Sequence, residues 1–254
     1  MSYFFSKIAQ VTFCLAILSN CNSVSNLNRV NGKQKSITKL NLSYQKLTEI
    51  PAVVFEMENL KVLNLNSNLI SEIPPEIGKL KNLKKLILSN NKIVSVADEI
   101  GHLKKLEKLS LRTNKIDQLP SSIGDLKSLE VLKLGFNNLV ELPKEICNLE
   151  NLTQLYAAYN ELEFLPSEIG KLRLTDLFIN QNQLKTLPNS FYKLSSLIRL
   201  NIANSGNAVS LTDHICSLRR IEELIIDYNS LTFSARCLEI RARSNPRFSI
   251  TISN

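Results

Sequence analysis

Residues 106–128 read LEKLSLRTNKIDQLPSSIGDLKS, and the order of apolar and turn-forming residues in this stretch predicts the fold. Numbered from Leu106, it has apolar residues at positions 1, 4, 6, 11, 14, 18 and 21, Asn at 9, Pro at 15 and Gly at 19. Positions 4 and 6 are apolar and their neighbours are polar, which indicates a short strand with one buried face. The Pro at position 15 ends this alternation, so we expect a return segment to begin there.

The same pattern recurs along most of the chain with a period close to 23 residues. The units begin at Ile37, Leu60, Leu83, Leu106, Leu129, Leu152, Leu174, Leu197 and Ile221. A single unit cannot bury its apolar face alone, whereas stacked units share one continuous core. An array of amphipathic helices would have similar apolar spacings, but a proline inside most units argues against it. We therefore expect a solenoid of nine units over residues 37–231.

Position 9 of the unit is asparagine in most repeats. A side-chain amide can both donate and accept hydrogen bonds, so it can satisfy backbone groups where the chain turns away from the strand. The residues at this position are Gln45, Asn68, Asn91, Asn114, Asn137, Asn160, Asn182, Ser205 and Asn229.

These residues together resemble the leucine-rich repeat family, in the subclass whose return segment reads LPxxIGxL. The resemblance covers residues 37–231, and the motif is seen in full at 119–126. It implies a right-handed α/β solenoid, or horseshoe. In this fold a parallel sheet lines the concave side, and short helical or irregular segments form the convex side.

Residues 232–254 break the period. Apolar spacing over 234–244 indicates a helix, and alternation over 248–252 indicates a strand. A terminal helix and strand would cover the exposed last unit, as solenoids require. Within the repeats, the sixth unit is one residue short near Leu172 and the eighth has one extra residue near Asn207. We expect irregular curvature at both places, from either a functional bulge or sequence drift.

The first 21 residues differ from the repeats and have the features of an export signal. Lys7 is their only charged residue, and residues 8–18 form an apolar run of 11 residues, the length of a signal-peptide core. The run ends in LSNC at 18–21, which resembles the lipobox of bacterial lipoproteins and, because of Asn20, its looser spirochaetal form. This resemblance implies diacylation of Cys21 and a lipoprotein of the bacterial outer membrane or surface.

Two acyl chains would hold the protein on a membrane, since a single chain gives only marginal binding. Residues 22–36 are polar and are expected to form a flexible tether. No apolar stretch reaches the roughly 18 residues that a transmembrane helix needs. The alternatives to a lipoprotein are an ordinary secretory signal cut nearby, which would give a secreted protein, or a buried first helix with a chance cysteine.

Composition and motifs argue against an enzyme. The chain has seven Gly and two His, and His102 and His214 lie several units apart. No metal-ligand spacing and no phosphate-binding loop is found in it, so we expect no catalytic residues, no metal and no cofactor. Cys147 and Cys216 occupy equivalent positions three units apart, beyond disulfide reach. Cys237 could pair with Cys216, but nothing in the sequence supports this, and we expect all three cysteines to be small core residues.

Positions 3, 5 and 7 of each unit point away from the core, so their side chains are free to bind a partner. Aromatic residues gather there at Tyr156 and Phe178, and Phe136 and Tyr159 adjoin them at position 8. Exposed aromatic residues supply affinity at many protein interfaces. However, single exposed aromatics are common, and Phe136 or Tyr159 could instead pack along the turn. The charged residues expected to contact a partner are Lys85, Lys108, Arg112, Lys133, Asp176, Glu223 and Asp227.

Charge is unevenly distributed along the chain. Residues 22–115 hold 16 Lys and Arg against 8 Asp and Glu, whereas residues 116–254 hold 14 against 15. Much of the excess lies in lysines between 79 and 108. A basic half close to a membrane anchor could contact anionic lipid or an acidic polysaccharide, or it could be a solvated, solubilising face. Export would exclude nucleic acid as a partner.

We hypothesise an exported, lipid-anchored leucine-rich repeat protein that binds a partner protein through its concave sheet. The resemblance implies that such bacterial surface proteins often bind host proteins or matrix. One alternative is an intracellular scaffold, because LPxxIGxL repeats also resemble Ras-group adaptors; it requires that residues 1–21 are not a signal. The other is an envelope protein whose basic half binds anionic glycan or lipid, which predicts salt-sensitive binding.

Overall fold

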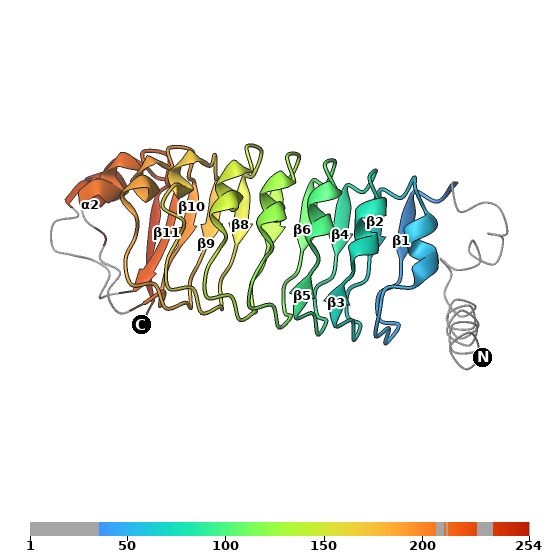
Figure 1. Ribbon diagram of the computed structural model, residues 1–254. Helices are drawn as coiled ribbons and strands as arrows, with labels where there is room; N and C mark the ends of the chain where they lie inside the picture. The colour runs from blue at the N-terminus through green and yellow to red at the C-terminus, as the bar shows by residue number, and fades with distance from the viewer. Residues whose placement is uncertain (1–35, 207–210, 212, 228–235, 254) are drawn as a thin grey trace, which may run out of the picture.

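The structure is a computed structural model that describes residues 36–206, 211, 213–227 and 236–253. Ten strands form one sheet in the order β1-β2-β4-β6-β7-β8-β9-β10-β11-β12, and a second sheet pairs β3 with β5 (Figure 1). Every pair of neighbouring strands is parallel, and one strand of the main sheet comes from each predicted unit, so the predicted solenoid is confirmed. The strands are β1 Lys39–Asn41, β2 Val62–Asn64, β3 Glu72–Ile73, β4 Lys85–Ile87, β5 Ser95–Val96, β6 Lys108–Ser110, β7 Val131–Lys133, β8 Gln154–Tyr156, β9 Asp176–Phe178, β10 Arg199–Asn201, β11 Glu223–Asp227 and β12 Ser249–Ser253.

The core follows from the register of the strands. From β1 to β10, each strand of the main sheet covers positions 3–5 of its unit, and the leucine at its centre is buried. Leu109 of β6 lies opposite both Leu86 of β4 and Leu132 of β7, and all three are at most 1% exposed. Because every unit places the same apolar positions at the same height, their side chains stack into one core along the solenoid.

The return segments form short 3-10 helices on the opposite side of the solenoid from the main sheet (Figure 1). In η5, for example, Pro120 directly precedes the helix and buried Ile123 packs it onto the core. Proline suits this place because it cannot continue a strand ladder. The helices are η2 Ala52–Glu56, η3 Pro75–Lys79, η4 Asp98–His102, η5 Ser121–Asp125, η6 Lys144–Asn148, η7 Ile169–Lys171, η8 Asn189–Lys193 and η9 Asp213–Ser217.

The glycine at position 19 is explained by the close approach of neighbouring 3-10 helices. A Cβ atom on Gly101 would lie 2.7 Å from the carbonyl oxygen of Ser122 in the next unit. No side chain fits there without moving the backbone. In the shortened sixth unit, η7 has three residues instead of five, so the missing residue shortens the return segment near Leu172. The extra residue of the eighth unit was predicted within 206–208, of which 207 and 208 lie outside the described residues.

After the main-sheet strands β1 to β10, the turn combines a left-handed residue at position 8 with a buried or half-buried polar side chain at position 9. The φ angles of Thr113, Phe136 and Tyr159 lie between 57° and 60°. The Asn114 side chain then spans two units: its Oδ1 accepts from the Ile93 N–H at 3.0 Å, and its Nδ2 donates to the Leu111 carbonyl at 2.9 Å. The predicted role of position 9 is confirmed.

A helix and a strand close the C-terminal end of the stack, as the tail predicts. The helix α2 (Arg236–Ser244) is followed by β12, which pairs with β11 over five residues. Leu238 and Phe248 are 2% and 7% exposed and extend the core to the end of the solenoid. The last repeat therefore does not end in an open apolar face.

The structure corrects the interpretation of two cysteines. Cys216 of η9 and Cys237 of α2 form a disulfide, with their Cα atoms 6.0 Å apart. The expectation that both are unpaired core residues is wrong, because α2 folds back against η9 and brings them together. Cys147 is buried and unpaired as expected, and burial raises the pKa of its thiol to about 11. A thiol with that pKa stays protonated and unreactive at neutral pH.

The predicted signal segment, Cys21 and the tether up to residue 35 lie outside the described residues. In the part of the chain that the structure describes, no helix has the length and apolar character needed to cross a bilayer.

Candidate partner-binding surface

The concave face is the face of the main sheet that lies opposite the 3-10 helices, formed by positions 3, 5 and 7 of the units. In β6, Leu109 is buried while Lys108 is exposed and Ser110 is half-buried, so side chains alternate across the sheet as predicted. Three regions follow one another along this face: a basic hollow over β4–β7, an aromatic run over β7–β10 and an acidic end at β11.

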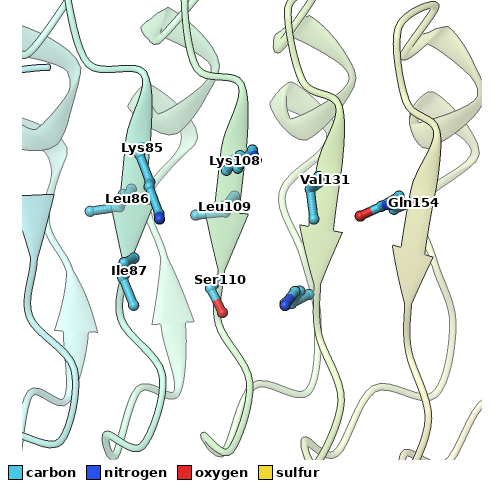
Figure 2. Close-up of a pocket in the computed structure, with 9 residues that line it drawn as sticks. Lys85, Leu86, Ile87, Lys108, Leu109, Ser110, Val131 and Gln154 are labelled. Atoms are coloured by element: carbon cyan, nitrogen blue, oxygen red, sulfur yellow. The ribbon is translucent and has the colours of Figure 1, made fainter. Parts of the chain in front are cut away.

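The basic hollow is a depression of about 340 Å³ at the N-terminal half of the concave face. Lys85 and Lys108 project from neighbouring strands on the same side of the sheet, with Val131 and Gln154 on the next two strands (Figure 2). Its lining residues are Lys85, Leu86, Ile87, Lys108, Leu109, Ser110, Val131, Lys133 and Gln154.

Two other lysines of the basic half lie outside the hollow and form ion pairs. Lys84 pairs with Glu107 at 2.6 Å, and Lys104 pairs with Asp125 at 3.4 Å. The excess of lysine between residues 79 and 108 is therefore divided between the concave face and the outer edge of the solenoid, where part of it is neutralised.

The aromatic run consists of Lys133, Tyr156, Phe178 and Arg199. The Tyr156 and Phe178 rings lie 5.1 Å apart between centroids, on register-paired residues of β8 and β9. Lys133 Nζ lies 5.4 Å from the Tyr156 ring and Arg199 Cζ lies 5.9 Å from the Phe178 ring, so a cation flanks each end of the pair. Burial, and then the charge of Asp176, raise the pKa of Tyr156, so its phenol stays neutral and can donate a hydrogen bond.

The Asp176 side chain is buried within this surface and binds neighbouring residues of the same chain. Its side chain is 5% exposed, its carboxylate accepts hydrogen bonds from Arg199 Nε and from the Thr175 hydroxyl, and the bond to Arg199 raises the pKa of that guanidinium. Asp176 therefore holds Arg199 against Phe178. Sequence reasoning missed Arg199 as a site residue, although opposite charges at position 3 of consecutive units signalled the pair.

Phe136 and Tyr159 form a separate rim pair at position 8. Their rings stack 4.2 Å apart with an interplanar angle of 9°, and Arg112 Cζ lies 4.7 Å from the Phe136 ring. They therefore pack along the turn, the alternative left open by the sequence. Both rings are still 39–45% exposed, so the pair borders the concave face.

The acidic end lies on β11, far from Lys85. Glu223 is half-buried and lies opposite Arg199 in the register. Asp227 Oδ2 accepts a hydrogen bond from the Asn204 N–H at 2.9 Å. Of the predicted charged residues, the structure thus gathers Lys85, Lys108 and Lys133 and places Glu223 and Asp227 at the other end. Within the described residues, no group of three potential metal-ligating side chains comes together.

Two family models match the chain: "Leucine rich repeat" over residues 35–93 and "Leucine-rich repeat region" over residues 97–163. No curated protein matches the sequence. Among solved structures, an LRR protein of Leptospira interrogans is 32% identical, with 86% of this chain and 61% of that chain covered and a TM-score of 0.67.

Two further solved structures have the same fold. The LRR ectodomain of the plant membrane receptor kinase GASSHO1/SCHENGEN3 from Arabidopsis thaliana, in complex with CASPARIAN STRIP INTEGRITY FACTOR 2, is 26% identical (88% of this chain, 27% of that one, TM-score 0.75). The functional domain of InlJ from Listeria monocytogenes is 20% identical (76% and 39%, TM-score 0.64), which shows the fold alone. The chain spans less than two thirds of each of these proteins. The two family matches and the stacked parallel strands lead to one conclusion: the chain is a leucine-rich repeat solenoid, and residues 35–93 and 97–163 match the models of that family.

Proposed function

We propose that this chain is an exported, lipid-anchored protein of the bacterial cell surface that binds a partner protein through its concave face. The aromatic run is the observation that carries the binding proposal. Two aromatic rings flanked by cations lie on an open sheet, and aromatic residues and arginine are enriched among the residues that supply most of the binding energy at protein interfaces. The Arabidopsis ectodomain, which shares the fold, was solved in a complex.

Export is supported by two independent features. One is the apolar run ending in LSNC at 18–21. The other is the Cys216–Cys237 disulfide, because disulfides persist mainly in oxidising compartments outside the cytosol. The intracellular-scaffold alternative has no comparable support, since a reducing cytosol would keep this pair open.

Replacing Cys21 by alanine is expected to move the protein from the membrane to the soluble fraction when it is expressed in a bacterial host. The reason is that two acyl chains on this residue would provide the stable anchor. Intact mass and membrane fractionation test this: the wild type should begin at Cys21 and carry acyl groups. Cys147→Ala is the matched control and should stay in the membrane. A soluble wild type that retains Met1 would contradict the export proposal.

The binding proposal predicts that a photo-crosslinking amino acid captures a partner protein from the concave face and not from the convex side. Gln154 on β8 and exposed Lys144 on η6 are suitable positions for the two probes. Combining the Gln154 probe with Tyr156→Ala and Phe178→Ala should lower the adduct yield by about tenfold or more, because buried aromatic anchors supply most of the affinity at interfaces.

The control for this experiment is Phe164→Ala. Phe164 is 50% exposed and contacts Lys185, away from positions 3, 5 and 7. It removes the same kind of ring from a different surface, so the adduct yield from Gln154 should stay unchanged. Equal yields from the Gln154 and Lys144 probes, or no effect of the double alanine change, would be evidence against a concave binding site.

A further inference from the structure

The concave face changes sign along its length. In units one to six, positions 3, 5 and 7 carry five cations and no carboxylate; the cations are Lys39, Lys85, Lys108, Arg112 and Lys133. In units seven to nine, the same positions carry three carboxylates and only Arg199 as a cation. The aromatic pair lies where the two regions meet.

The lysines of the basic hollow lack internal counter-charges. Within the described residues, the lysines that form ion pairs, such as Lys84 and Lys104, lie outside the concave face, and no ion pair involves Lys85, Lys108 or Lys133. Lys85 and Lys108 also lie directly opposite each other in the strand register. Like charges in this arrangement destabilise a sheet, and a bound anion would relieve their repulsion. The position of these lysines therefore favours binding of an anionic ligand and does not stabilise the fold.

The hollow suits acidic side chains rather than a bare ion. Its volume of about 340 Å³ is open on one side, and Ile87 and Val131 provide apolar contact for the methylene groups of an acidic side chain. Ser110 and Gln154 add hydrogen-bonding groups to the lining. The carboxylates of one or two neighbouring acidic residues could thus meet both cations and polar donors.

From β4 to β9 the sheet covers four strand spacings, or about 19 Å at roughly 4.8 Å each. An extended segment of about six residues, or about thirteen residues of α-helix, covers that distance. Such a segment, with acidic residues at one end, reaches from the hollow to Phe178. A uniformly anionic glycan matches the hollow but is repelled at Glu223 and Asp227.

Building on the proposed function, we infer that the concave face binds a protein segment with an ordered polarity. Its acidic residues lie in the basic hollow over β4–β7, its apolar residues lie on Tyr156 and Phe178, and its basic residues lie near Glu223 and Asp227. The partner is recognised by the order of its charges and not by net charge alone.

The test uses the full chain in detergent and three fluorescent probes. The first is a twelve-residue peptide with four Glu, then Leu-Phe-Leu-Phe, then four Lys. The second has the same composition in shuffled order, and the third is heparin. Fluorescence anisotropy should give a Kd for the ordered peptide about tenfold or more below that of the shuffled peptide, because both ends then meet opposite charge.

Lys85→Ser combined with Lys108→Ser should weaken binding of the ordered peptide by about tenfold or more without lowering Tm, since the change removes a like-charge contact. Lys81→Ser with Lys144→Ser is the matched control: it removes the same charge from the outer surface and should leave Kd unchanged. A drop in Tm with the first pair would show that these lysines serve the fold and would overturn the inference.

Equal Kd values for the ordered and shuffled peptides, or no binding of either, would also overturn the inference. Tighter binding of heparin than of the ordered peptide would assign the hollow to an anionic glycan instead. If polarity has no effect but crosslinking from Gln154 still depends on Tyr156 and Phe178, the proposed function stands and only the polarity is wrong. If polarity has no effect and crosslinking from Gln154 is also independent of Tyr156 and Phe178, both the proposed function and the inferred polarity are rejected.

Discussion

Replacing Asn137 by alanine should lower the free energy of unfolding by about 4 kcal/mol, because the change removes the partners of three backbone groups at once. Asn137 Oδ1 accepts from the Ile116 N–H at 3.0 Å, and Nδ2 donates to the carbonyls of Leu111 and Leu134 at 2.9 and 2.8 Å. The side chain is only 7% exposed, so water cannot easily take its place. Urea denaturation followed by circular dichroism measures the loss.

Asn138→Ala is the control for this prediction. Asn138 is exposed, and among the described residues its one hydrogen bond runs from its backbone N–H to the Ile116 carbonyl at 2.9 Å. Alanine keeps that bond, so stability should change by less than about 0.5 kcal/mol. A similar loss for both variants would mean that the buried amide does not hold adjacent units together.

The repeat predicts most of the fold because a constraint that recurs in every unit can be recognised without an alignment. Leu109 is placed correctly because the same spacing puts Leu86 and Leu132 at equivalent positions. The amide of Asn137 follows from the same reasoning, since a polar residue at a fixed position among leucines must have backbone partners. The concave face then follows from strand alternation alone.

The repeat pattern does not predict features that depend on contacts between particular side chains. The stacking of Phe136 on Tyr159 requires the left-handed backbone at position 8, which those residue types do not suggest. Asp176 was expected to face a partner, but Arg199 of the next strand covers its carboxylate. Whether a concave charge faces solvent thus depends on the neighbouring unit as well as on its own position.

The cap shows a different limit. The period of the repeat gives distances only between equivalent positions of the repeating units, and α2 lies outside the repeat. The distance between Cys216 and Cys237 therefore could not be obtained from the period, although the helix and strand themselves were visible as local patterns.

Replacing both Cys216 and Cys237 by serine should destabilise the C-terminal end of the solenoid by about 3 kcal/mol, the value expected for opening a loop of this size. The two cysteines are separated by 21 residues. Without the bond, α2 is still held by buried Leu238, and Arg241 Nη1 still donates to the Leu218 carbonyl at 2.8 Å. Denaturation with and without a reductant measures the effect. The wild type and Cys147→Ala should lose stability on reduction, whereas the double serine variant should not respond.

The loss of stability in the double serine variant should be confined to the C-terminal end. This distinguishes it from the effect of Asn137→Ala. Each unit of a solenoid contacts only its neighbours, so a weakened end frays without unfolding the middle. Hydrogen exchange in the double serine variant should therefore accelerate in β11 and β12 and stay unchanged in β6. In Asn137→Ala it should accelerate around β6 and β7. Unchanged exchange in β12 after reduction would show that its pairing with β11, and not the disulfide, holds the cap in place.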